Sequence, residues 1–353
     1  MLNDIPAWIG YVAMSNEALP ALARLTRTQP EAANFTRGLR AELLPDGAHR
    51  IEVNPPPGAF SDAPRAWTTR YPLDLIHEIH ATKGFYVCDE IMRDEDPRYV
   101  ERALRHEVLG YVEPRDFAGK RVLDVGCGAG ASTLVMSRLL PSCEIVGVEL
   151  QERLLRLARL RAQRLGKAGT RFVLSPSGLS LPEGIGEFDY IVMSAVFEHL
   201  LPGERTALLP RIWSHLKPGG VLFINQTPHR WSPVETHTTG LPLINYLPDG
   251  LAFRVARLSR RVKREDDWAS LLRGGVRGAT INEIVALLGG AARATLLQPK
   301  PSVGDQIDLW YGKLSRRHAW LKKGIWALLK LLKPIAGAHL VPELTLAIRK
   351  TAA

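Results

Sequence analysis

Cysteine and long apolar segments are both scarce in this chain. It has three cysteines, Cys88, Cys127 and Cys143, which are odd in number and widely spaced. That pattern gives neither a disulfide framework nor the paired spacing of a zinc site, so we expect reduced thiols. No run approaches the ~18 to 20 apolar residues of a spanning helix, and Met1 to Asp4 lack the basic charge that opens a signal peptide. These absences predict a cytoplasmic protein, either soluble or peripheral on the inner face of a membrane.

Positive charge is concentrated in the last third of the sequence. The whole chain of 353 residues has 46 Lys and Arg against 36 Asp and Glu, a net charge of +10. From Leu251 onward the counts are 19 against 7. Such asymmetry indicates an anionic neighbour, namely a membrane surface, a nucleic acid or a phosphorylated substrate. Because no RNA- or DNA-binding module accompanies the charge, we expect no nucleic acid partner.

A strand, a glycine-rich turn and a helix follow one another near the middle of the chain. The strand is predicted over Arg121 to Val125 and the helix over Ser132 to Leu140, before Pro141. Between them lie the alternating glycines Gly126, Gly128 and Gly130. Glycines allow a tight turn and let the backbone approach a ligand closely.

A second predicted strand, Glu144 to Val148, brings Glu149 to the edge of the same crevice. A carboxylate there can accept two hydrogen bonds from a ribose diol, which indicates a nucleoside pocket. A dinucleotide site would have the spacing G-x-G-x-x-G, whereas here Asp124 precedes the first of three alternating glycines. An acid at that position repels a pyrophosphate and suits a cationic ligand.

This pattern resembles motif I of the class I S-adenosylmethionine-dependent methyltransferases. Two further segments follow in the family's order, Phe188-Asp189-Tyr190-Ile191-Val192 and Leu216-Lys217-Pro218-Gly219-Gly220, the second as a turn before a strand over Val221 to Asn225. The resemblance covers about Asp116 to Gln226. It implies an α/β Rossmann-like fold with a mostly parallel seven-stranded sheet, helices on both faces, an N-terminal cap and two acceptor-side insertions.

The resemblance also implies that S-adenosylmethionine is the cofactor. The three glycines would line it, Asp124 would orient its amino-acid end through the loop, and Glu149 would hold the ribose. Relatives usually carry an Asp after the third strand, here Thr170 to Leu174, and Ser177 is its replacement in this sequence. The full set of implied cofactor residues is Asp124, Gly126, Cys127, Gly128, Gly130, Glu149, Leu150, Ser177 and Ser194.

The remaining segments predict a cap and two insertions. Residues 1–90 form a cap or substrate-side extension, and residues 91–353 form the main domain, which a helix starting at Asp96-Pro97 opens. The insertions, 227–278 and 299–340, follow predicted strands, and a final strand begins at Glu343. In this family, segments at the carboxyl ends of the strands shape the acceptor site.

The first insertion opens with a dense polar cluster. His229, Glu235 and His237 follow the fifth strand of the resemblance, where a parallel sheet opens its crevice. Methyl transfer needs an aligned acceptor and, for a hydroxyl, removal of a proton, which a neutral histidine does well near pH 7. We predict His229 or His237 as the base, with Glu235 orienting it or binding the acceptor. The alternative is that these residues only hydrogen-bond a long loop to the core.

Glu198-His199 resembles part of the E-x-x-E-H metal site of some quinone and RNA methyltransferases. Ala195 stands where the first acid would be, so we predict no metal. His199 would contact the acceptor or the cofactor, and a helix-capping role is the alternative.

Two basic segments, 253–264 and 310–333, interleave apolar residues with Lys and Arg. Such a pattern is typical of an interfacial helix on an anionic membrane. An amphipathic lid packed on its own domain is the alternative.

Taken together, the sequence predicts an S-adenosylmethionine-dependent methyltransferase. Its acceptor would be a small molecule, a sugar or a lipid-linked compound, methylated on a hydroxyl oxygen. Pro228 to Pro248 resembles bacterial methyltransferases of glycans and secondary metabolites. The alternatives are carbon methylation of a quinone-like ring, an NAD-dependent oxidoreductase, and a nonenzymatic scaffold that keeps the pocket.

Overall fold

The structure is a computed structural model that describes residues 38–55, 63–166, 169–313, 319–336 and 341–351. The chain divides into two compact units, Met1–Met92 and Arg93–Ala353. The sequence-based boundary was placed at residue 90. Much of the predicted cap, residues 1–37, lies outside the described residues.

The first unit is built on a small antiparallel sheet. Its strands are β1 (Leu39–Leu43), β2 (His49–Val53) and β3 (Ala66–Thr69), in that order. They are followed by α1 (Leu73–Lys83), η1 (Gly84–Tyr86) and α2 (Val87–Glu95). Ile51 and Val53 are buried while Arg50 is exposed, as expected for a sheet with one covered face. The apolar face of α1, Leu75, Ile76 and Ile79, is also buried.

The second unit alternates strands and helices over most of its length. The elements from the beginning of this unit to β8 are η2 (Pro97–Glu101), α3 (Arg102–Glu107), η3 (Pro114–Phe117), β4 (Arg121–Val125), α4 (Ala131–Leu139), β5 (Glu144–Glu149), α5 (Glu152–Arg164), β6 (Thr170–Leu174), β7 (Phe188–Ser194), η4 (Phe197–His199), α6 (Pro202–Ser214) and β8 (Leu216–Pro228). Then come η5 (Ile244–Tyr246), α7 (Asp249–Ala256), α8 (Trp268–Arg273), α9 (Ile281–Leu287), β9 (Ala294–Leu296), α10 (Gln306–Lys313), α11 (Ala319–Ala336) and β10 (Glu343–Lys350).

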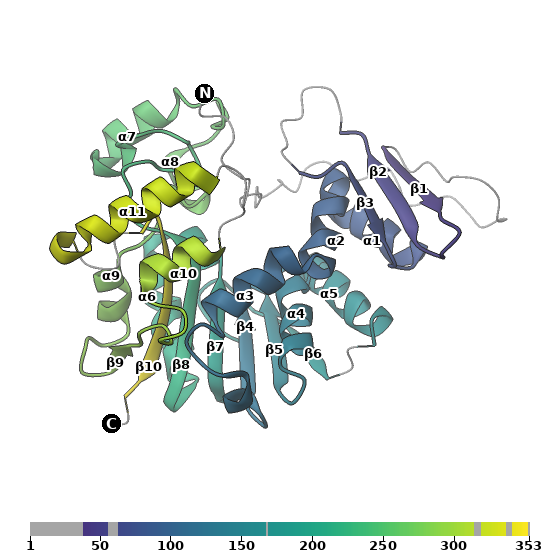
Figure 1. Ribbon diagram of the computed structural model, residues 1–353, viewed down its shortest axis with the longest axis horizontal. Coiled ribbons are helices and arrows are strands. Elements are labelled where there is room, and N and C mark those ends of the chain that lie inside the picture. Colours follow the sequence, from purple (N-terminus) through teal and green to yellow (C-terminus); the bar gives the residue numbers. More distant parts are fainter. Residues whose placement is uncertain (1–37, 56–62, 167–168, 314–318, 337–340, 352–353) are drawn as a thin grey trace. The chain divides into compact units, whose positions relative to one another are not determined.

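The strands of the second unit form a seven-stranded sheet in the order β6-β5-β4-β7-β8-β10-β9 (Figure 1). Strands β6, β5, β4, β7 and β8 are parallel to one another. Only β10 runs against its neighbours, β8 and β9. The predicted mostly parallel Rossmann-like sheet is therefore confirmed.

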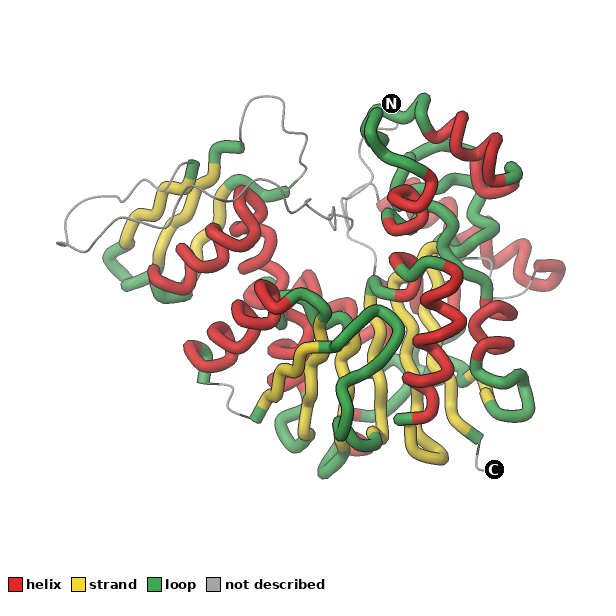
Figure 2. Tube along the Cα trace, turned by 180° about the vertical axis from the view of Figure 1, so that it is seen from behind, coloured by secondary structure: helices red, strands yellow, loops and turns green. Residues whose placement is uncertain are grey.

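Alternate residues of each strand face two different helical layers, as the pleat of a strand requires. Val122 of β4 and Val192 of β7 belong to a cluster with Val135 of α4. Leu123 and Ile191, one position away, belong to a cluster that includes residues of α6 and α9. Figures 1 and 2 show helices on both faces of the sheet. Because both faces are covered, these strands are apolar nearly throughout.

Apart from one-residue shifts at the ends of α4 and β5, two predicted elements differ from the structure. The predicted turn Leu216–Gly220 lies within β8, where the pairing shifts from Phe188 with Leu216 to Tyr190 with Val221. The helix predicted from Asp96 does begin there, and Asp96 accepts a hydrogen bond from Arg98 N, but it is kinked at the non-helical Tyr99 (φ −104°, ψ −113°) within η2 before α3 begins.

Within the described residues, no helix combines the length and the apolar character needed to cross a bilayer.

Candidate active site

The glycine turn joins β4 to α4 at the carboxyl edge of the sheet. Gly126, Gly128 and Gly130 all have positive φ, at 70°, 55° and 87°. A Cβ at Gly126 would lie 2.6 Å from Val196 Cγ2, and one at Gly130 would lie 2.8 Å from Ala158 Cβ. Backbone conformation and packing therefore both require glycine at the first and third positions.

Asp124 is buried beneath this turn and holds it to the helix. Its Oδ2 accepts hydrogen bonds from Ser132 Oγ (2.7 Å) and Thr133 Oγ1 (2.6 Å) in the first turn of α4. Burial raises the pKa of Asp124 to about 6, and the two hydroxyls oppose that shift. The predicted role of Asp124, to orient the amino-acid end of the cofactor through the loop, stays a prediction.

Glu149 fastens the glycine turn to the end of β5. Its Oε2 accepts a hydrogen bond from Gly128 N (3.0 Å), and its Oε1 accepts from Leu150 N (2.8 Å) and Gln151 N (3.0 Å). Carboxylate oxygens offer about four acceptor sites in all, so room is left for a ligand hydroxyl. The half-exposed Leu150 side chain follows directly.

The other predicted cofactor residues are placed less favourably. The Cys127 side chain is buried in a core cluster with Leu134 and Phe172, and burial raises its pKa well above the usual value. Only its backbone can face a ligand at the turn. Ser177 Oγ is engaged locally, since it lies 3.0 Å from Ser180 Oγ and accepts from Leu179 N (3.2 Å).

Ser194, the remaining predicted cofactor residue, ends β7. Its Oγ accepts a hydrogen bond from Asn225 Nδ2 at 3.4 Å. The next residues carry the chain past the glycine turn, where Val196 contacts Gly126. Taken with Glu149, this arrangement fits a nucleoside, because glycines let the backbone of the turn approach a ligand closely and a carboxylate stands beside the turn.

Two residues beyond Val196, three titratable side chains converge. Glu198 Oε1 lies 3.7 Å from His199 Nε2 and 3.8 Å from His237 Nε2. One ligand atom from each of the three lies within 4.8 Å of the other two. Glu198 is fully buried, His237 nearly so, and the His199 side chain is 23% exposed. We call this group the Glu-His-His cluster.

The hydrogen bonds of the two imidazoles fix where their protons are. His199 Nδ1 lies 2.6 Å from Arg273 O, and His237 Nδ1 lies 2.8 Å from Gly274 O. A carbonyl can only accept, so each Nδ1 carries a proton and donates it. Burial lowers the pKa of His199 below its usual value, and burial together with His199 lowers the pKa of His237 to about 4. Both rings are therefore neutral near pH 7, with an unprotonated Nε2 facing Glu198.

Glu198 completes this arrangement with an unsatisfied oxygen. Its Oε2 accepts from Thr227 Oγ1 (3.2 Å), whereas its Oε1 is buried and has no hydrogen-bond partner among the described residues. Burial raises the pKa of Glu198 to about 8. Each imidazole Nε2 thus lies less than 4 Å from Glu198 Oε1, and all three atoms lie within 4.8 Å of one another. Such an arrangement favours a proton or a metal cation at its centre.

A single loop holds both imidazoles in place. Arg273 ends α8, and the next two residues are Gly274 and Gly275. Gly275 has φ +89°, and a Cβ there would lie 2.8 Å from His237 Nδ1. Hydrogen bonds from an imidazole to backbone carbonyls are the usual way in which proteins orient a catalytic or metal-binding histidine.

Among the predicted catalytic residues, His199 and His237 belong to the cluster, whereas His229 and Glu235 do not. His229 Nδ1 accepts a hydrogen bond from Trp231 N (3.3 Å) in its own loop. Glu235 is buried and accepts hydrogen bonds from Thr238 N and Thr239 Oγ1, and burial raises its pKa. Glu235 therefore closes the loop that carries His237 and acts on that residue only indirectly.

Sequence reasoning set aside the most deeply buried member of the cluster. Glu198 was considered only as part of an incomplete metal motif, because Ala195 replaces the first acid. The structure brings His237 to it from 38 positions beyond His199, a pairing that no local spacing could show. The signal that was available is an acid and a histidine directly after a buried strand.

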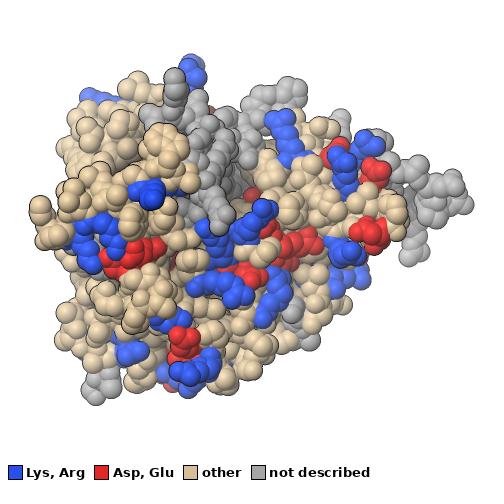
Figure 3. Space-filling view, viewed as in Figure 1, with Lys and Arg blue, Asp and Glu red and all other residues tan. Residues whose placement is uncertain are grey.

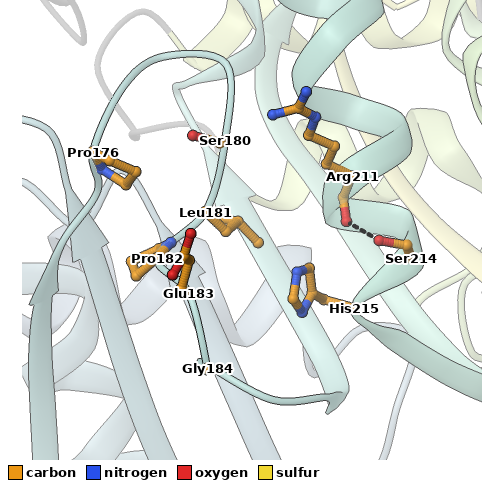
Figure 4. Close-up of a pocket in the computed structure, with 9 residues that line it drawn as sticks. All are labelled: Pro176, Ser180, Leu181, Pro182, Glu183, Gly184, Arg211, Ser214 and His215. Atoms are coloured by element: carbon orange, nitrogen blue, oxygen red, sulfur yellow. Dashed lines mark hydrogen bonds between the residues drawn. The ribbon is translucent and has the colours of Figure 1, made fainter.

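A cavity of about 430 Å³ lies between α6 and the loop that follows β6. It is bounded by the loop Pro176–Gly184 and by Arg211, Ser214 and His215 (Figure 4). Leu181 and His215 face the space between that loop and the helix. His215 precedes β8, so this end of the cavity lies at the opposite edge of the sheet.

Comparison with known proteins gives consistent matches. The methyltransferase domain family matches residues 122–220. A trans-aconitate 2-methyltransferase of Variovorax paradoxus is 30% identical over 216 residues, which cover 61% of this chain and 68% of the relative. A ubiquinone biosynthesis O-methyltransferase of Xanthomonas euvesicatoria pv. vesicatoria is 36% identical over 157 residues, covering 43% and 64%. A second trans-aconitate 2-methyltransferase, of Methylobacterium radiotolerans, is 28% identical, and the chain spans 60% of its length.

Among solved structures, an S-adenosylmethionine-bound amino pentose methyltransferase from Micromonospora echinaspora is 27% identical, with a TM-score of 0.31 over 38% of this chain and 53% of that one. The chain spans about three fifths of the length of the Methylobacterium and Xanthomonas relatives. The family match covers the segment that carries the glycine turn, Glu149 and the Glu198-His199 pair. The chain belongs to the class I S-adenosylmethionine-dependent methyltransferases.

Proposed function

We propose that the protein transfers a methyl group from S-adenosylmethionine to a hydroxyl oxygen of a small-molecule acceptor, which can be a sugar or a lipid-linked compound. The observation that carries this proposal is the position of the Glu-His-His cluster, two residues from the side chain that packs on the glycine turn. The matched relatives include an O-methyltransferase and two trans-aconitate methyltransferases, which supports a small acceptor that reacts at oxygen.

Bound S-adenosylmethionine would supply a methyl group on a sulfonium, which is already a good leaving group. The protein then has to orient the acceptor and remove one proton. As the acceptor oxygen bonds to the methyl carbon, the carbon–sulfur bond breaks, and the hydroxyl proton passes to an imidazole Nε2. The products are the methyl ether and S-adenosylhomocysteine.

His199 is the member of the cluster best placed to receive that proton. Its side chain is 23% exposed, against 9% for His237. Its Nδ1–H is donated to Arg273 O, which holds the ring with Nε2 on the side of Glu198. The proposal replaces His229, which lies outside the cluster, and keeps His237 as a supporting residue.

The test is turnover to S-adenosylhomocysteine by His199→Ala and His237→Ala with an active acceptor. We expect His199→Ala to lower kcat by about 10²-fold or more, with cofactor affinity unchanged in a titration. His215→Ala is the matched control, since His215 Nδ1 also lies 2.8 Å from a backbone carbonyl, that of Gly186, but at the other edge of the sheet. Full activity in both cluster variants would rule out the proposed base.

The same cluster has a second candidate role as a site for a divalent cation. Oε1 of Glu198 and the two Nε2 atoms are a carboxylate and two imidazoles, a ligand set that zinc and several other divalent metals accept. The backbone carbonyls that bind each Nδ1 supply the usual outer-shell support. A cation there would lower the pKa of a hydroxyl that binds to it. The sequence-based expectation of no metal noted that a metal would need replacement ligands from the His229–His237 loop, and His237 is a residue of that kind.

Titration of dialysed protein with Zn²⁺ or Mn²⁺ distinguishes the two roles. A metal role predicts one bound ion per chain, lost in His237→Ala and retained in His215→Ala. No binding by the unmodified protein, or equal binding by both variants, would leave proton transfer as the role of the cluster.

A further inference from the structure

Helix α11 packs on its own unit through two lysines and a tryptophan side chain as well as the buried Leu329. Lys330 Nζ donates to Asp305 Oδ2 (2.9 Å) and Asp308 Oδ2 (2.6 Å), and Lys333 Nζ donates to Asp305 Oδ2 (2.6 Å). Trp326 Nε1 donates to Asp308 Oδ1 (2.9 Å). The buried Leu329 lies on the same face. At about 100° per residue these four residues of α11 fall within an arc of about 100°, so they form one stripe that faces α10 and the segment before it.

The opposite face of α11 is apolar and exposed. Its large side chains are Trp320, Leu321, Ile325, Leu328, Leu331 and Ile335. Trp320, Leu331 and Ile335 are 77%, 74% and 88% exposed. At about 100° per residue these six positions span an arc of about 140°, centred roughly opposite the stripe that faces α10. From Trp320 to Ile335 the arc is about 22 Å long.

This polarity is the reverse of what a packed lid requires. A lid would bury its apolar face and leave its lysines in water. Here the lysines on the inner face are engaged with Asp305 and Asp308, and six large apolar side chains point away from the unit. A continuous apolar strip of this kind is typical of an interaction surface.

The charged residues beside this exposed apolar arc of α11 indicate which kind of partner binds it. Lys322 and Lys323 lie about 60° beyond the two sides of the arc, one on each side, and α11 contains no acidic residue. In Figure 3 the surface over α11 is mostly uncharged, with a band of basic and acidic side chains below it. Exposed Arg254, Arg260 and Lys263 in and after α7 add positive charge to the same unit.

We infer that α11 lies in the interface of an anionic lipid membrane. Apolar side chains would enter the acyl boundary, and the flanking lysines would reach the phosphate groups. With four lysines, α11 would lie along the surface rather than cross it. A second copy of the chain is a poorer occupant, because it would bring the same positive charges to the same edges. The inference does not depend on the proposed methyl transfer.

The experiment is co-sedimentation of the full chain with two kinds of vesicle at low salt. One kind is phosphatidylcholine alone, and the other contains phosphatidylglycerol in about equal amount. We expect binding to the second kind, weakened about tenfold or more by Leu331→Glu or Ile335→Glu. Leu43→Glu is the control, since Leu43 is 67% exposed in β1 of the first unit.

Two further measurements control for misfolding of the variants and for pairing between copies of the chain. Cofactor binding by Leu331→Glu and Ile335→Glu checks that the second unit is still folded in these variants. The mass of the protein in solution reports on pairing between copies. Absence of binding to anionic vesicles, or equal loss in Leu331→Glu and Leu43→Glu, would overturn the inference. A dimer that Leu331→Glu dissociates, without vesicle binding, would show that a second copy covers α11.

Discussion

Glu149 and Glu198 are both buried carboxylates near the carboxyl edge of the sheet, yet their oxygens have different surroundings. Glu149 accepts three backbone hydrogen bonds and fixes the glycine turn. Glu198 has one oxygen without a donor among the described residues, facing two neutral imidazoles. The first carboxylate therefore builds the shape of the site, and the second is available for proton or cation chemistry.

The pH dependence of stability should report on Glu198. Its pKa is raised from 4.5 to about 8 in the folded state, so its stabilising effect is complete below pH 4.5 and lost as pH rises through 8. His237 acts in the opposite sense, because its pKa falls from 6.5 to about 4, and its effect is lost only as pH falls through 4. Between pH 6.5 and 8 the effect of Glu198 changes, whereas that of His237 does not. We therefore expect the free energy of unfolding to fall less in Glu198→Gln than in the unmodified protein over this range. Urea unfolding at the two pH values measures this, with the exposed Glu265→Gln as control. Parallel losses in all three proteins would contradict a buried, protonated Glu198.

Substitution of Glu149 should weaken cofactor binding. Glu149→Gln places an amide where backbone N–H groups now donate, so the glycine turn loses an acceptor and a ribose loses its carboxylate partner. Hydrogen bonds to charged groups contribute about 1.5–3 kcal/mol, which corresponds to at least a tenfold weaker titration with S-adenosylmethionine. Glu144→Gln, at the other end of β5, is the matched control. Unchanged affinity in Glu149→Gln would remove Glu149 from the pocket.

At the scale of elements, the loop after α8 determines whether the Glu-His-His cluster exists. Gly275→Ala adds a Cβ 2.8 Å from His237 Nδ1 at φ +89°. Gly290→Ala has a similar φ, +83°, with nothing within 4 Å of its Cβ. Both should cost about 1–2 kcal/mol of stability from backbone strain, but only Gly275→Ala should also lower turnover. Equal activities in the two variants would mean that the loop does not position His237.

The bounds of a helix or strand could be predicted from the sequence where a local pattern of residues determines them. β4 and β6 were predicted at their observed bounds, because buried parallel strands are short apolar runs followed by turn residues. The kink at Tyr99 and the register shift in β8 depend on packing against other elements, which local spacing does not encode. The same holds for the cluster: His237 was predicted as a base, but its contacts with Glu198 and Gly274 join segments 37 or more positions apart.

At the scale of the whole molecule, the excess of Lys and Arg over Asp and Glu lies in the last third of the chain. If the excess positive charge after Leu251 meets anionic lipid, then Arg260→Glu and Arg264→Glu should each weaken binding to phosphatidylglycerol vesicles about fivefold, from ~1 kcal/mol per basic residue near the surface. Added salt should shrink the difference through screening. Arg115→Glu, exposed outside the last third, is the control. Equal effects of all three reversals would show that net charge alone, and not its location, governs binding.

The position of β10 has a consequence for how the protein is made. β10 pairs with β8 on one side and β9 on the other, although β8 ends at Pro228 and β10 starts only at Glu343. While the ribosome synthesises the residues between them, the edge of β8 has no neighbour, and β9 has nothing to join. Such an open edge is a template for pairing with other nascent chains. Folding of the sheet therefore has to finish late, and a chaperone that shields β8 would have most of its effect before β10 emerges.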